Sequence, residues 1–559
     1  MSWSVPVRQR RRGRDSAWWP VAAVSATALA AATVPYLIAL RRQDADHRFT
    51  GLVGGVDDNN VYLALMRQAR DGAWLLKNTF TPEPSRPAVF NVLYELLGRL
   101  STLTGVPLIA WHHLYGAAAA ILLTFLAWTF FAGAFRDPRF RRAGVFLAVF
   151  ASGVMGLRSL IGPAIGWRMR SPDSWLSELT TFHSILIYPH FVFSTMLVLA
   201  SLVGFLSGLE RARPGRALLG GLACTALVFS HAFDATIVLG TLAAFSTASF
   251  LREGRAALSR LVPPGLAFLA PLVPAILLTR WMLASEPRWS AVVARLDFPA
   301  PNPWELLMGT GITGVFAALF LVAGSTPAGG PPGRLTRVLL ARSWVGAVIG
   351  LLYLPWIPWQ WHLLNGIQIP LSLLALDGAR RHAMTGRFAL RRLIGLWPRR
   401  LASPVACLLV ALCGVSALSD PQLVRMYVRE VRNRASGIFL TPGEIAALGW
   451  LESSTPHSAV VLTAPEIGHF VPRLAGNTVV VGEDLLTENY LAKAAQASRF
   501  YSGATDAERL AMLRQWNIAY LVHGPAERAL GSWDPASSAV FVSVFQSDGT
   551  SVYRVRGSR

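Results

Sequence analysis

The chain has 559 residues, of which 53% are apolar and 15% are charged, and its formal net charge is +21 at pH 7. This composition is too apolar for a soluble chain of such length, whereas it suits several membrane spans joined to a polar part. The positive charge comes from short arginine clusters between apolar runs, a pattern that orients a membrane protein and excludes nucleic acid as a partner. The sequence therefore predicts a polytopic α-helical membrane protein.

The N-terminus carries the basic sequence RQRRRGR, followed by an apolar run from Trp18 to Leu40. This run is longer than the apolar part of a signal peptide, which has about 7 to 15 residues. It therefore predicts a retained first helix, with residues 1–17 as a basic cytoplasmic segment.

Further apolar runs of spanning length follow along the chain. They lie at 112–135, 143–160, 184–208, 216–251, 261–283, 306–325, 343–358, 363–377 and 401–419. The run 216–251 is too long for one helix and is interrupted by SHAFDAT, so we divide it into two short helices joined at His231 to Asp234. With the first helix, the sequence predicts about eleven spans.

Arginine clusters fall on every second loop, the same side as the N-terminus. They are RDPRFRR, ERARPGR, LREGRAALSR, GRLTR and the segment 378–400. Because basic loops stay in the cytoplasm, the first loop 41–111, the stretches 158–183 and 284–305, and everything after residue 420 face outward. Nearly all the unusual polar residues lie in these outward parts.

The first outward loop opens with an acidic pair, Asp57 and Asp58, at the head of an amphipathic segment. We expect Asp58 to cap a helix from Asn59 to Arg70, with the two aspartates exchanging roles if the helix starts one residue earlier. Capping explains one aspartate and not both. A carboxylate held rigidly at the membrane face could accept a proton from a sugar hydroxyl, so Asp57 and Asp58 are the catalytic candidates, with Asp57 favoured as the base.

The same loop continues to a second helix, in which Val89, Leu93 and Leu100 belong to an apolar face that should lie on the membrane surface. Between the two helices, Glu83 and Arg86 could contact a substrate or form an exposed ion pair.

Ionisable residues also enter the predicted spans from their outer ends, where such residues usually face a cavity. Glu178, His183 and His190 stand in SELTTFHSILIYPHFVFS, with the two histidines seven apart and so on nearly the same face. They could bind a metal, although no third ligand is evident, or form hydrogen bonds between helices. His231 and Asp234, three residues apart, either form a structural hydrogen bond or orient a head group.

Three more residues have a structural and a functional interpretation. Arg158 and Arg280 lie near outer ends of spans, where they could extend to the interface or bind phosphate. His362, in WQWHLLNGIQIP, is a candidate of the same kind.

After about residue 440, the apolar runs become too short to span a membrane and alternate with amphipathic segments. SAVVLTA, NTVVVGE and NIAYLVHG have the pattern of buried strands, and GEIAALGWLESS and DAERLAMLRQW that of helices. AVFVSVFQSDGTSVYRV contains two alternating runs around Asp-Gly, which indicates a hairpin. The sequence therefore predicts a C-terminal α/β domain, residues 440–559, that folds as an independent unit outside the membrane. It has no nucleotide-binding or hydrolase motif, and we expect it to dock or hold a substrate.

This order of parts resembles the GT-C superfamily of integral membrane glycosyltransferases: a first span, an outward loop with an acidic pair and two interfacial helices, further spans, and an outward α/β tail. The resemblance is architectural over most of the chain, and its sharpest local part is VDDNNVYLALMRQARDGAWLLKNTFTPEPSRP. The tail PGEIAALGWLESSTPHSAVVLTAPEIGHF is similar to those of uncharacterised bacterial members. The resemblance to this superfamily implies a GT-C-like membrane domain over residues 18–420 of a protein in the bacterial cytoplasmic membrane.

The resemblance further implies that Asp57 or Asp58 is the catalytic carboxylate. Nucleotide sugars are made in the cytoplasm, so an outward site would take its sugar from a lipid such as a polyprenyl phosphate and pass it to an extracytoplasmic glycan, lipid or protein. One displacement would invert the anomeric centre, and Arg158, Arg280 or a histidine would stabilise the departing phosphate. The adjacent aspartates lack the spacer of a D-x-D motif, so no cofactor is assigned and a divalent metal ion is left as an open alternative.

Two other functions fit a polytopic chain with polar groups in a membrane cavity. A transporter or lipid flippase often has paired halves with interrupted helices, but the two halves of this chain do not align with each other. The second of these functions is that of a catalytically silent scaffold, whose tail binds partners in the cell envelope. Release of polyprenyl phosphate from a lipid-linked sugar separates the transferase from both.

Overall fold

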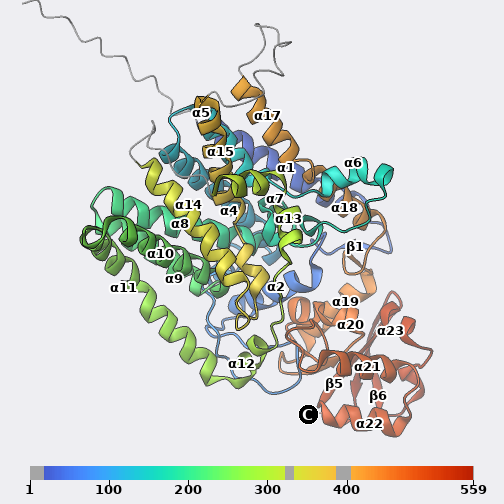
Figure 1. Ribbon diagram of the computed structural model, residues 1–559. Helices are drawn as coiled ribbons and strands as arrows, with labels where there is room; N and C mark the ends of the chain where they lie inside the picture. The colour runs from blue at the N-terminus through green and yellow to red at the C-terminus, as the bar shows by residue number, and fades with distance from the viewer. Residues whose placement is uncertain (1–17, 322–332, 386–403, 558–559) are drawn as a thin grey trace, which may run out of the picture.

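The computed structural model describes residues 18–321, 333–385 and 404–557 (Figure 1). The expected cytoplasmic N-terminus and parts of the two loops 329–342 and 378–400 lie outside these residues. Among the described residues, seven helical segments are long and apolar enough to cross a membrane, which confirms an integral membrane protein. They are α1 (Trp19–Arg41), α4 (Leu108–Ala134), α8 (Pro189–Glu210), α10 (Ala232–Glu253), α11 (Arg255–Ser285), α14 (Arg334–Leu352) and the segment Val405–Arg432, formed by most of α17 (Pro404–Ser416) together with α18 (Asp420–Arg432).

Three further helices also belong to the helical bundle in the described part of the chain. They are α9 (Pro214–Val228), α13 (Pro303–Leu321) and α15 (Gln368–Thr385). Helix α9 packs against α8 and α11, and α13 packs against α15. The predicted division of the run 216–251 is confirmed, because α9 ends at Val228 and α10 begins at Ala232. The count of eleven spans stays a prediction.

The run 143–160 was expected to form one span, and the structure shows a bent pair instead. Helix α5 (Pro138–Phe150) and helix α6 (Met155–Ile165) meet at an angle of 70°. The amides at the bend find partners in other helices: Ser152 N donates to Ser416 O (2.9 Å), and Val154 N donates to Met308 O (3.0 Å). These tertiary hydrogen bonds replace the helical ones and fix the bend.

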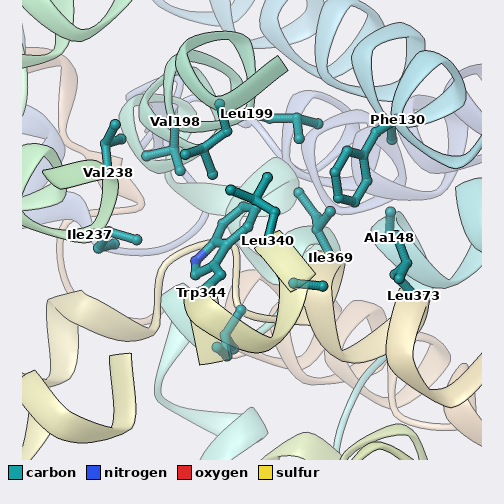
Figure 2. Packing of buried hydrophobic residues seen from close by; sticks show 14 of the residues in the cluster. Phe130, Ala148, Val198, Leu199, Ile237, Val238, Leu340, Trp344, Ile369 and Leu373 are labelled. Carbon is teal, nitrogen blue, oxygen red and sulfur yellow. The ribbon is translucent and has the colours of Figure 1, made fainter. Parts of the chain in front are cut away.

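The core of the bundle consists of fully buried aliphatic and aromatic side chains from many helices. Figure 2 shows Trp344 of α14 beside Val198 and Leu199 of α8 and Ile237 and Val238 of α10. Each of these side chains is at most 1% exposed. This dense packing holds the N-terminal ends of α8 and α10, which carry the polar residues described below, in fixed positions.

The first outward loop contains α2 (Val56–Arg70) and α3 (Val92–Thr104), which pack against each other. The apolar face of the second helix was predicted to lie on the membrane surface, but Leu93 and Leu97 of this face are buried within the protein. Leu96 and Leu103 are 56% and 82% exposed, a surface suited to the membrane interface. Short elements lie in the other outward stretches: η1 (Pro172–Ser174), η2 (Ser177–Leu179), α7 (Thr181–Ile187), α12 (Pro287–Ala294) and η3 (Gln360–Leu364).

The tail forms a five-stranded sheet in the order β4-β3-β5-β7-β6, as expected for an α/β domain. The strands are β3 (Val460–Leu462), β4 (Thr478–Val479), β5 (Ile518–His523), β6 (Phe541–Ser547) and β7 (Thr550–Val555). Strand β3 is parallel to β4 and β5, and β7 is antiparallel to β5 and β6. The hairpin turn at Asp548 and Gly549 has positive φ at both residues, which confirms the Asp-Gly prediction.

The helices of the tail are α19 (Pro442–Ser454), α20 (Pro465–Gly468), η5 (Val471–Ala475), α21 (Tyr490–Tyr501), α22 (Asp506–Gln515), α23 (Pro525–Leu530) and η6 (Pro535–Ser537). Helices α19 and α22 were predicted, and both begin with a capping box. The intervening α21 was not predicted. Its residues Ala497 and Phe500 complete the core under the sheet.

The tail packs directly on the first outward loop. Strand β1 (Arg48–Phe49) pairs with β2 (Phe439–Leu440), so the two polar parts begin side by side. Arg67 of α2, which is 3% exposed, donates to Leu474 O (2.6 Å) and to Glu452 (2.8 Å). A single apolar cluster continues from α2 into α19 and β3. The loop and the tail therefore position each other.

Candidate active site

Helix α2 begins at Val56, three residues earlier than expected, with Gly55 as its N-cap. Asn59 N donates to Gly55 O (2.9 Å), so the first helical hydrogen bond closes around the acidic pair. The prediction that Asp58 caps the helix is therefore wrong: Asp57 and Asp58 both lie in the first turn, where the helix dipole favours negative charge. Gly55 has φ 53°, and a Cβ there would lie 2.6 Å from the hydroxyl oxygen of Tyr188.

The two aspartates face different surroundings. Asp58 is half-buried and accepts a hydrogen bond from Tyr62, one turn along α2. Burial, and then the negative charge of Asp57, raise the pKa of Asp58 to about 7, against the opposing effect of Tyr62. Asp57 is exposed, and its charge acts on His469 and Tyr490 of the tail.

Asp58 lies near the N-terminal ends of α8 and α10, and its pKa also responds to the charges of Glu178 and His231. His231, which precedes α10, places its Nδ1 3.1 Å from Asp234 Oδ2. That Asp234 oxygen also accepts hydrogen bonds from Ser194 Oγ and Asn365 Nδ2, both at 2.6 Å. Because Asp234 is fully buried and held from three sides, it fixes the orientation of His231.

A second carboxylate and imidazole pair lies beside the first. His362 Nδ1 is 2.8 Å from Glu178 Oε1. The His231 ring centroid is 5.8 Å from that of His362 and 5.9 Å from that of His190. These contacts bring together six of the twelve residues singled out in the sequence. We call Asp58, Glu178, His190, His231, Asp234 and His362 the outward cluster.

Within the outward cluster, His190 lies between His231 and Tyr62 of α2. It is 3% exposed, and its ring centroid is 4.2 Å from that of Tyr62. Neither ring nitrogen of His190 has a hydrogen-bond partner among the described residues. Tyr62, Ser194 and Asn365 were not singled out in the sequence. Tyr62 could have been found from its position four residues after Asp58, on the same face of a helix.

His183 does not belong to the outward cluster, although it is seven residues before His190. Its Nε2 lies 2.8 Å from the hydroxyl oxygen of Tyr427 on α18. This is the hydrogen bond between helices that the sequence left as one alternative. A bend in the chain separates the two histidines, because α7 ends at Ile187 and α8 begins at Pro189.

Four other candidates also lie elsewhere. Glu83 pairs with Lys493 of the tail (2.6 Å) and lines a cavity of about 440 Å³ between the first outward loop and the tail. The backbone amide of Arg86 donates to Glu286 (2.9 Å). Arg158 lies on α6, and Arg280 is exposed on α11.

The outward cluster does not have the form of a metal site. Within residues 18–321, 333–385 and 404–557, no group of three or more His, Cys, Asp or Glu side chains is placed to hold a metal ion. In the cluster the carboxylates of Glu178 and Asp234 face His362 and His231, and so orient imidazoles. This geometry suits proton transfer and the donation of hydrogen bonds to an anion.

No protein-family profile and no curated protein matches this sequence. Solved structures match its fold. The oligosaccharyltransferase of Archaeoglobus fulgidus, tethered with an acceptor peptide containing the NVT sequon, is similar with a TM-score of 0.53 and 13% identity, over 91% of this chain and 69% of that one. The same organism's AglB, in complex with an inhibitory peptide and a dolichol-phosphate, gives 0.50 and 14%, over 95% and 74%.

ArnT from Cupriavidus metallidurans, in the apo state, is similar with a TM-score of 0.51 and 13% identity, over 96% of this chain and 98% of that one. The archaeal and bacterial structures are both GT-C glycosyltransferases. At sequence identities of 13% to 14%, these similarities show a shared fold and nothing more. The chain therefore has the GT-C fold, as its sequence predicted.

Proposed function

We propose that this protein is a membrane glycosyltransferase that moves a sugar from a lipid-linked polyprenyl phosphate donor to an extracytoplasmic acceptor. The GT-C fold supports this proposal, since structures with that fold include one with bound dolichol-phosphate and one with an acceptor peptide. The observation that carries it is Asp58: a carboxylate whose pKa is raised to about 7, on a rigid helix, at the outward end of a membrane bundle. A group with this pKa can take a proton at neutral pH.

Asp58, rather than Asp57, is the proposed base. Its carboxylate takes the proton from an acceptor hydroxyl, whose oxygen attacks the anomeric carbon of the donor sugar. The bond between that carbon and the phosphate oxygen breaks, and the phosphate leaves on its lipid. A single displacement of this kind inverts the anomeric centre.

The departing phosphate needs hydrogen-bond donors in a fixed arrangement. His231, oriented by Asp234, acts on Asp58 through its charge, and His362, oriented by Glu178, lies beside His231. In their protonated forms the two histidines would each donate the second ring N–H to the phosphate. His190 adds two ring nitrogens that have no partner in the described part of the protein. Glu83, Arg86, Arg158, His183 and Arg280 have no part in this proposal, since their contacts lie elsewhere.

We also propose where the protein lies and how it is oriented in the membrane. The arginine clusters favour a cytoplasmic N-terminus, with residues 18–420 in the bacterial cytoplasmic membrane and the α/β domain, residues 440–559, outside. The outward cluster then faces the side on which lipid-linked sugars are used. The lipid tail of the donor would lie between the spans.

The test uses the purified full-length protein and a radiolabelled polyprenyl-phosphate sugar. We expect release of polyprenyl phosphate that depends on added acceptor, together with transfer of the label to the acceptor. A transporter or flippase would move the labelled lipid between the leaflets of a vesicle without breaking the bond to the sugar. A silent scaffold would do neither.

A further inference from the structure

The chain forms an arm at the edge of the bundle, which we define as residues 155–171. It contains α6, whose axis is turned by 70° from that of α5, and the segment that returns from Gly166. Figure 1 shows α6 beside α18, with no other helix on its far side. The base of the arm is fixed, because Gly156 N donates to Ser419 Oγ (3.0 Å) and Met155 N donates to Asp173 Oδ2 (3.3 Å).

Beyond its base, the arm carries an uncovered apolar stripe. Leu157, Leu160, Ile161, Ala164 and Ile165 follow the spacing of one helix face. None of them is buried, and Leu160, Ile161 and Ile165 are 63%, 44% and 65% exposed. In α6 only Gly156 and Gly162 are buried. A helix normally buries such a stripe, so something other than the described part of this chain covers it.

The rest of the arm is positively charged. Arg158, Arg168 and Arg170 lie within residues 155–171, which contain no Asp or Glu. Arg158 donates to the backbone oxygens of Trp167 and Arg168, and Arg170 donates to Ser174 Oγ. Among the ion pairs of the described residues, none joins one of these arginines to a carboxylate. Their charge is therefore free to meet an anion.

We propose that the arm is a lipid-binding element that lies in the outer membrane interface, with its stripe among the acyl chains and its arginines on the head groups of anionic phospholipids. An apolar stripe bordered by arginines is the pattern of a helix that lies in the interface plane. Each arginine near such a surface strengthens binding about fivefold. An anionic leaflet complements the arm in both respects, whereas a second copy of this strongly basic chain does not match its charge.

The first experiment measures the depth of the arm in nanodiscs of phosphatidylcholine and phosphatidylglycerol. Nitroxide labels are attached to the variants Leu160→Cys, Ile161→Cys and Ser159→Cys of the full-length protein. Cys407 and Cys413 are replaced by Ala, and Cys224 is kept because it is buried. We expect the labels at 160 and 161 to collide with oxygen and not with a water-soluble nickel chelate, and the label at 159 to show the reverse.

Two results contradict the proposal. If all three labels collide with the nickel chelate, the arm lies in water. If the labels at 160 and 161 collide with neither reagent, protein covers the stripe, as in contact with a second copy. Thermal unfolding of each labelled variant at the temperature of the parent protein shows that the fold is intact.

The second experiment tests the charge. A fluorophore at Ile161→Cys is quenched by nitroxide-labelled phosphatidylglycerol or phosphatidylcholine. We expect the anionic lipid to quench at about fivefold lower mole fraction or better, and the triple variant R158Q/R168Q/R170Q to lose this preference. The control variant R514Q/R554Q/R556Q makes the same change of charge at exposed residues of the tail and should keep the preference. Equal quenching by both lipids in the parent protein, or full competition by inorganic phosphate, overturns the assignment to a lipid head group.

Discussion

At the scale of single residues, two adjacent aspartates differ in what they can do. Asp58 faces Tyr62 and the histidines at the outer end of the bundle, whereas Asp57 is exposed toward the tail. The sequence could not distinguish them, because the difference comes from groups more than 100 residues away, such as Glu178 and His231. It also led to the wrong cap, since the helix starts at Gly55, which is in the αL conformation and leaves no room for a Cβ beside Tyr188.

The substitution Asp58→Asn removes the proposed base while keeping the size of the side chain. We expect turnover with a lipid-linked donor to fall by about two to four orders of magnitude, while the protein stays folded. Asp57→Asn is the matched control and should retain most of the activity. Equal loss in both variants, or full activity in Asp58→Asn, would contradict the assignment of Asp58.

The activity should also depend on pH through Asp58. Because the base acts in its ionised form, kcat/KM should rise with pH and level off above an apparent pKa of about 7. Folding raises this pKa from 3.8, so ionisation of Asp58 opposes folding between pH 3.8 and 7, and fully above pH 7. Asp58→Asn should therefore raise the thermal midpoint at pH 8 and change it little at pH 3.8. A pH profile that stays flat from 5 to 9 contradicts the proposed base.

At the scale of elements, α2 is held by the tail as much as by its own helical hydrogen bonds. Arg473 is 8% exposed, and it donates to Asn60 Oδ1 (2.8 Å) and to Thr50 O (2.7 Å). Asn60 follows Asp58 by two residues, so this contact fixes the turn that carries the proposed base. Burial lowers the pKa of Arg473 to about 10, which leaves it charged at neutral pH.

Replacing Arg473 by Met keeps much of the buried volume and removes both hydrogen bonds. One buried oxygen and one partly buried oxygen then lose a charged donor, which costs on the order of 2 to 4 kcal/mol. We expect the thermal midpoint to fall by several degrees and turnover to fall at least tenfold. Arg514→Met, at an exposed position on α22, is the control and should change neither.

The sequence predicted most of the elements, because their signals are local. The Asp-Gly hairpin, the helix α19 and the break before α10 all depend on neighbouring residues. The bend between α5 and α6 was missed, since the amides that fix it bond to Ser416 and Met308 in distant helices. Similarly, six of the twelve polar candidates came together in space, but no sequence pattern separates them from His183 or Glu83.

At the scale of the whole molecule, the distribution of arginine predicts the orientation in the membrane. The loops 136–142, 209–216, 252–260, 329–342 and 378–400 should be cytoplasmic, because moving arginine clusters outward is unfavourable. Single cysteines placed in these loops should escape a membrane-impermeant maleimide in intact cells. A cysteine at Ser453 on α19, which is exposed, should be labelled. Labelling of two or more of the basic loops overturns the topology.

The contact between the first outward loop and the tail has a consequence for biosynthesis. Thr50 donates to Gly437 O across 387 positions of the chain, and β1 pairs with β2 nearby. A ribosome delivers α2 early, whereas β2 and Arg473 emerge only after the last span. During most of translation, the helix with the acidic pair therefore lacks the partners that fix it. If the protein has the proposed function and topology, we expect the nascent chain to stay inactive until the tail has folded on the first outward loop.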